Sequence, residues 1–227
     1  MEILIIKSPT GWRYTMGTKQ IKDFEQTNHM LEDASIAIIQ YWRTYSNLNT
    51  WQFWFLLGAL IVPLIILYFL IDKKRALLIG FFGFNIHVWF HYFDLFTTTH
   101  GLTNYPYKAI PFLPVSILLD TTLIPVAFML LYQWTTHHNK NYYLYATSLS
   151  AFIAFLFKPA LVTFDLFRIY KGMNYFYIFL IILFVSFLSK WMTNLFLQFQ
   201  KQDGDSRRPL VKTYKLNRLF PRREKAK

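Results

Sequence analysis

Residues 51–71 read WQFWFLLGALIVPLIILYFLI, a run of 21 residues without a charged side chain. At a rise of about 1.5 Å per residue, a helix of this length matches the hydrocarbon core of a bilayer, which is about 30 Å thick. Four more runs of similar length, with almost no charge at their centres, follow at residues 76–96, 111–133, 142–166 and 174–194. The sequence therefore predicts an all-α, polytopic helical membrane protein with five transmembrane helices.

The composition fits this class. Of 227 residues, 54% are hydrophobic, 20% are aromatic and 16% are charged, which excludes a disordered protein and does not suit an ordinary soluble domain. The chain has no cysteine, so disulfides, thiol nucleophiles and iron–sulfur clusters are excluded together. Residues 201–227 contain ten Lys/Arg and three acidic residues, so they supply +7 of the formal net charge of +12.

Three segments organise the chain: an extra-membrane segment at 1–50, a membrane domain at 51–194 and a basic tail at 195–227. Within the first, residues 18–45 are predicted to form an amphipathic helix, because apolar side chains recur at helical spacing at Phe24, Leu31, Ile38, Trp42 and Tyr45. We expect this helix to rest on its own protein. The alternative is that it lies in the lipid interface.

Loop charge predicts the orientation. The basic turn at 73–75, Lys140 and the tail all fall on one side of the membrane, whereas the other side has only Lys108, Arg168 and Lys171 in its short loops. By the positive-inside rule, the tail is cytoplasmic. With five spans in a cell membrane, residues 1–50 are then expected on the outer side.

Several polar side chains interrupt the apolar runs. Burying such a group in a bilayer is costly, so each is expected to have a polar partner, a hydrated cavity or a functional role. We expect them to form one interior site in the outer half of the membrane. We predict that Lys158 pairs with Asp120, since a neutral pair costs less to bury than two separate charges. The predicted intramembrane cluster consists of Asn85, His87, His91, Asp94, Asp120 and Lys158.

Three functions remain open on this pattern. The first is a non-enzymatic membrane component whose polar site serves helix packing and also passage of protons or a small solute. The second is a membrane-embedded metal-dependent enzyme, because His87, His91 and Asp94 at i, i+4 and i+7 have ligand chemistry suited to a transition metal. The third is an assembly partner that docks through residues 18–45 or the tail. No motif for nucleotide binding or acyl transfer occurs, and no other cofactor is predicted.

The tail predicts contact with anionic lipid headgroups at the cytoplasmic face. Nucleic acid is not predicted as a partner, because the tail contains no folded recognition module. A protein partner or a homo-oligomer remains open. The basic side chains expected to face lipid are Arg207, Arg208, Lys212, Lys215, Arg218, Arg222 and Arg223.

The stretch 104–114, NYPYKAIPFLP, is followed by Asp120 and Pro125. This Tyr-Pro-x-Lys…Pro…Pro loop resembles a family of small multi-pass membrane proteins of spore-forming Gram-positive bacteria, and the resemblance extends from the first span to Trp191. The family pattern has Glu before the proline of the fourth span, where this chain has Lys158. The resemblance implies a location in a bacterial plasma or spore-envelope membrane, and no activity.

Overall fold

The computed structural model describes residues 4–8, 11–15, 17–111 and 119–206, with side chains for 17–111 and 121–200. The chain is an all-α, multi-pass helical membrane protein, as predicted. Its helical segments are α1 (Thr18–Tyr45), α2 (Trp51–Leu70), α3 (Ala76–Thr99), η1 (Leu119–Leu123), α4 (Ile124–His137), α5 (Tyr142–Phe152), η2 (Ile153–Phe157), α6 (Lys158–Thr163) and α7 (Tyr175–Ser206).

Four helices are long and apolar enough to cross a bilayer. They are α2, α3, the continuous segment Tyr142–Thr163 formed by α5, η2 and α6, and the first 26 residues of α7. Much of their surface carries exposed large apolar side chains, and in α2 these reach 76% exposure at Phe69. Such a surface is stable against lipid and would be an aggregation liability in water.

The remaining predicted span, 111–133, corresponds to η1 and α4. These two segments form a helix that ends at His137 and packs against α2, α3 and α5. Residues 112–118 lie outside the described residues, so a fifth span stays a prediction. At the C-terminus, α7 continues to Ser206, past the predicted boundary at residue 194.

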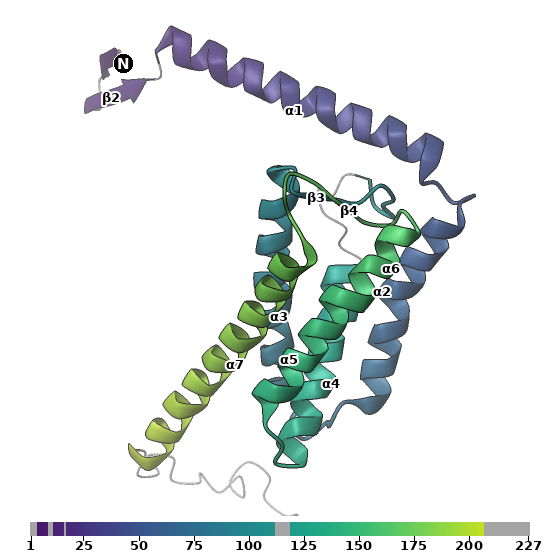
Figure 1. Cartoon of the computed structure of the whole chain (residues 1–227). Helices are drawn as coiled ribbons and strands as arrows, with labels where there is room; N and C mark the ends of the chain where they lie inside the picture. The colour runs from purple at the N-terminus through teal and green to yellow at the C-terminus, as the bar shows by residue number, and fades with distance from the viewer. Residues whose placement is uncertain (1–3, 9–10, 16, 112–118, 207–227) are drawn as a thin grey trace, which may run out of the picture.

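The connections gather at two ends of the bundle (Figure 1). One end, which we name the α1 end, holds α1 and the short strands β3 (Thr103–Asn104) and β4 (Arg168–Ile169), which pair antiparallel. The opposite end holds the turn after α2, the turn after α4 and the end of α7. At that end, the Gln133 side chain joins α4 to the end of α2. It accepts from the Asp72 backbone N–H at 2.8 Å and donates to Leu70 O at 2.9 Å.

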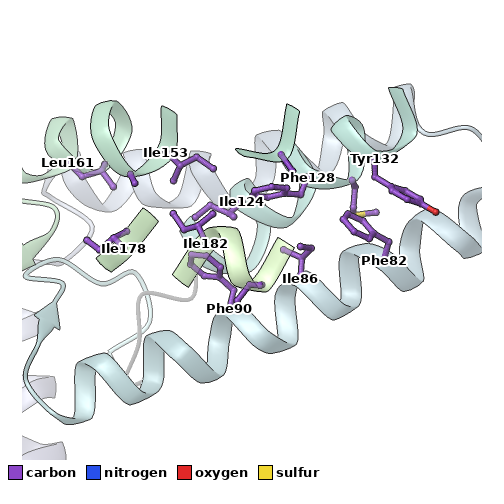
Figure 2. Packing of buried hydrophobic residues seen from close by; sticks show 14 of the residues in the cluster. Phe82, Ile86, Phe90, Ile124, Phe128, Tyr132, Ile153, Leu161, Ile178 and Ile182 are labelled. Atoms are coloured by element: carbon purple, nitrogen blue, oxygen red, sulfur yellow. The ribbon is translucent and has the colours of Figure 1, made fainter. Parts of the chain in front are cut away.

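Apolar side chains fill the space between the helices. Figure 2 shows a column of them that runs from Phe82 and Tyr132 at one end to Leu161 and Ile178 at the other. Phe82 stacks on Tyr132 with ring centroids 4.4 Å apart, and Tyr142 meets Phe82 edge-on at 5.8 Å. These packed rings fill space between the helices in the half of the bundle opposite α1.

Among the described residues, three prolines lie inside helices of the bundle, and two of them follow a π-helical turn with one residue between. Pro125 comes after η1 and Pro159 after η2, each at the first or second position of the next α-helix. Proline has no backbone N–H, so a regular α-helix would lose a hydrogen bond there. A widened turn before each proline accommodates that loss inside a continuous helix. The third, Pro63, lies buried within α2.

The amphipathic helix forms over the predicted range, Thr18–Tyr45, but none of its residues is buried. The expectation that it rests on its own protein is therefore wrong for most of its length. α1 runs across the α1 end of the bundle (Figure 1). Several of its apolar side chains are exposed, and Phe24 and Leu31 are more than half exposed. Before it, β1 (Leu4–Ser8) and β2 (Gly11–Thr15) form an antiparallel hairpin, which the sequence analysis did not predict.

The grouping of the loops gives a direct test of orientation. Because the natural chain lacks cysteine, one introduced thiol is the only reactive sulfhydryl. We expect a membrane-impermeant maleimide to label Asn104→Cys on intact cells and to label Lys74→Cys only after permeabilisation. The opposite labelling pattern would overturn the predicted topology.

Candidate functional site

Two helices end in the same way at the α1 end, and this brings their polar residues into one layer. After α3, Gly101 adopts φ 62° while the backbone N–H groups of Leu102 and Gly101 return to Thr97 O and Thr98 O. After α6, Asp165 adopts φ 56°, with Leu166 N–H and Asp165 N–H donating to Leu161 O and Val162 O. Both are Schellman caps, which end a helix abruptly and turn the chain back over it.

Each capped helix carries one buried charged residue at the same height. Asp94 lies five residues before Thr99, the last residue of α3, and Lys158 lies five residues before Thr163, the last residue of α6. Both side chains are therefore about 8 Å from the ends of their helices. Asp94 is 7% exposed and Lys158 is 3% exposed.

Tyr105 connects the two charges. Its hydroxyl donates to Asp94 Oδ1 at 2.8 Å and accepts from Lys158 Nζ at 3.2 Å, and its side chain is 3% exposed. A hydroxyl can donate and accept at once, so it can serve a carboxylate and an ammonium group together. We name Asp94, Tyr105 and Lys158 the buried network. Hydrogen bonds that involve charged groups are stronger than neutral ones, particularly away from water.

Aromatic rings and hydroxyl groups surround the buried network. Lys158 Nζ lies 4.3 Å from the centroid of the Phe167 ring, close enough for a cation–π contact. Thr103 Oγ1 donates to Thr97 Oγ1 at 2.9 Å, and Thr97 Oγ1 donates to Asp94 O at 3.1 Å. A cavity of about 30 Å³ adjoins Asp94 and Lys158, which is about the volume of one water molecule in the liquid.

The structure thus joins two of the six residues of the predicted cluster. Asn85 donates to Phe81 O on its own helix at 2.8 Å. His87 and His91 lie one turn apart with ring centroids separated by 6.1 Å, and His87 Nδ1 is buried without a hydrogen-bond partner among the described residues. Asp120 lies on η1, but its side chain is outside the described ones, so its pairing with Lys158 stays a prediction.

The proposed metal ligands do not form a cluster. Seven residues along α3 separate His87 from Asp94, which is about 10 Å along the helix axis. Asp94 Oδ1 instead accepts a hydrogen bond from the Tyr105 hydroxyl. Nowhere in the described part of the chain do three metal-ligating side chains come together.

One residue of the site, Tyr105, was misassigned at the sequence level, and a further intramembrane cation outside the site, Lys190, was missed. From the sequence, Tyr105 is indistinguishable from an aromatic residue of the membrane interface. It lies in a loop, where helical periodicity gives no information about its contacts. Lys190 on α7 is a further half-buried cation, with Nζ 4.4 Å from the centroid of the Tyr132 ring. Its position within the fifth apolar run was the available signal.

A second polar feature lies between α1 and the loops of the α1 end. Trp42 Nε1 donates to Lys108 O at 2.7 Å, while Ser46 Oγ donates to Lys108 O and accepts from Lys108 N–H, both at 2.9 Å. These bonds fasten the end of α1 to the loop. Burial lowers the pKa of the Lys108 ammonium group, and the Asp94 carboxylate opposes this effect. Arg168 Nη2 donates a hydrogen bond to Asp165 Oδ1, and this bond raises the pKa of the Arg168 guanidinium group.

No protein family, curated protein or solved structure matches this chain. The basic residues predicted to contact lipid, from Arg207 to Arg223, lie outside the described residues. The site is therefore defined by the geometry at the α1 end alone.

The hydroxyl of Tyr105 is directly testable. Tyr105→Phe should lower the free energy of unfolding by about 1–3 kcal/mol, because two buried charged groups each lose a hydrogen bond. The measurement is unfolding of the detergent-solubilised protein by increasing SDS. Tyr107→Phe, two residues further along, is the control and should change the value by less than about 0.5 kcal/mol. Equal effects of the two variants would remove Tyr105 from the network.

Proposed function

We propose that this chain is a non-enzymatic integral membrane component in which the buried network serves helix packing. Its specific role is to fasten the loop after α3 across the ends of α3 and α6. The observation that carries this is the Tyr105 hydroxyl, which lies 2.8 Å from Asp94 Oδ1 and 3.2 Å from Lys158 Nζ with all three side chains buried.

The connectivity supports a packing role. Asp94 belongs to α3, Lys158 to α6 and Tyr105 to the loop between α3 and η1, so three separate parts of the chain share one set of hydrogen bonds. Inside a membrane domain, where helices have little hydrophobic drive to associate with one another, polar contacts of this kind favour one arrangement over others.

Passage of protons or a solute through the bundle has less support. The buried network occupies the α1 end, whereas the stacked rings of Phe82, Tyr132 and Tyr142 fill the opposite half. A path across the membrane would need these rings to separate. A metal-dependent enzyme likewise lacks a ligand cluster in the described residues. Docking through the basic tail stays a prediction.

A double-mutant cycle tests the proposal. Lys158→Met or Asp94→Leu alone should each destabilise the protein by about 3–5 kcal/mol, since one substitution removes part of the compensation on which the other buried charge depends. The double variant should lose about 1–3 kcal/mol less than the sum of the two. The measurement is again unfolding by SDS in detergent.

The control cycle combines Lys158→Met with Asp165→Asn. Asp165 is 61% exposed and pairs with Arg168, so its effect should add to that of Lys158→Met. If the Asp94 cycle is also additive within about 0.5 kcal/mol, the two buried charges do not stabilise each other and the proposed packing role fails.

A further inference from the structure

A groove of about 680 Å³ lies between the C-terminal part of α1 and the loops of the α1 end. Its lining includes Ile38, Tyr41 and Trp42 from α1, Lys108 from the loop after α3, and Arg168 and Tyr170 from the loop after α6. The volume is within the range of small-molecule sites, which is roughly 300–1,000 Å³. The groove lies next to the buried network and shares Tyr105 with it, whereas Asp94 and Lys158 are not part of the groove lining.

The walls of the groove are held by hydrogen bonds to backbone groups. Lys108 O accepts from both Trp42 and Ser46, which fixes α1 relative to the loop after α3. The pairing of β3 with β4, together with the bond from Tyr170 N–H to Leu102 O at 2.8 Å, joins the two loops. The groove is therefore formed in advance of any ligand.

The chemistry of the lining favours an anionic amphiphile. Lys108 and Arg168 supply two cations. Asp165, which accepts from Arg168 Nη2 at 2.8 Å, and the buried Asp94 carboxylate, which acts on Lys108, supply opposing charge. A guanidinium group has five N–H donors, so Arg168 retains donors for an anion. Ile38, Tyr41 and Tyr170 add apolar and aromatic surface beside these cations.

The height of the groove in the molecule identifies the source of such a ligand. Lys108 lies beyond the end of α3 at Thr99, and Arg168 lies beyond the end of α6 at Thr163 and before α7 begins at Tyr175. The groove thus sits just past the ends of the membrane-spanning helices. This is the level of the lipid headgroups.

We propose that the groove binds the headgroup of an anionic phospholipid from the adjacent leaflet. Lys108 and Arg168 bind the phosphate, and Tyr41 and Tyr170 contact the glycerol region. The acyl chains leave the groove along the apolar surface of the bundle. In this arrangement α1, which buries no residue against its own chain, covers a bound lipid.

Native mass spectrometry of the detergent-solubilised full chain tests this with dioleoyl phosphatidylglycerol and dioleoyl phosphatidylcholine as probes. The natural chain should bind one phosphatidylglycerol with an affinity about tenfold above that for phosphatidylcholine. Lys108→Gln/Arg168→Gln should lose this preference, and Lys108→Arg should keep it. Lys22→Gln on α1 makes a single charge change away from the groove and should leave binding unchanged. An unfolding midpoint equal to that of the natural chain establishes that each variant is folded.

Several results would overturn the proposal. Equal binding of the two lipids by the natural chain excludes headgroup recognition. A preference that survives the double substitution places lipid binding elsewhere, for example at the basic tail. If millimolar inorganic phosphate abolishes the binding of phosphatidylglycerol, the groove is a site for soluble phosphate and not for a lipid.

Discussion

Burial of the Lys158 ammonium group is the constraint on which the α1 end of this protein depends. Removing such a group from water costs several kcal/mol unless hydrogen bonds and opposite charge compensate for it. Here the compensation includes the Tyr105 hydroxyl, which is itself bonded to Asp94, and the faces of nearby aromatic rings. Since these groups come from different parts of the chain, the charge can be accommodated only when α3, α6 and the intervening loop are correctly assembled.

The rest of the α1 end follows from this arrangement. The Schellman caps after Thr99 and Thr163 turn both loops back over the bundle, and the β3–β4 pairing joins them. The joined loops then offer Lys108 O to Trp42 and Ser46, which sets the direction in which α1 departs. Polar contacts at the α1 end of the bundle thus position α1 and the groove that it lines.

Hydropathy and helical periodicity predicted most of the helices, including the limits of α1. They also selected Asp94 and Lys158 as residues that needed a partner. The predicted cluster contained both residues but not the bridge between them. Their equal depth was not predicted, because two helix ends were misplaced by three residues each: the predicted spans ended at 96 and 166, whereas α3 ends at Thr99 and α6 at Thr163. The cap after α6 uses Asp165 in the left-handed region, where glycine is the usual signal. The bridging Tyr105 comes from a loop, and periodic patterns carry no information there.

The most direct test of the central claim measures whether the buried network keeps the loop closed. Thr103, 3% exposed, precedes the exposed Asn104, and the natural chain has no cysteine. A maleimide should label Thr103→Cys at least about tenfold more slowly than Asn104→Cys, and adding Lys158→Met should bring the two rates together. If Thr103→Cys stays equally protected when Lys158 is replaced, the loop is held by other contacts and the account is wrong.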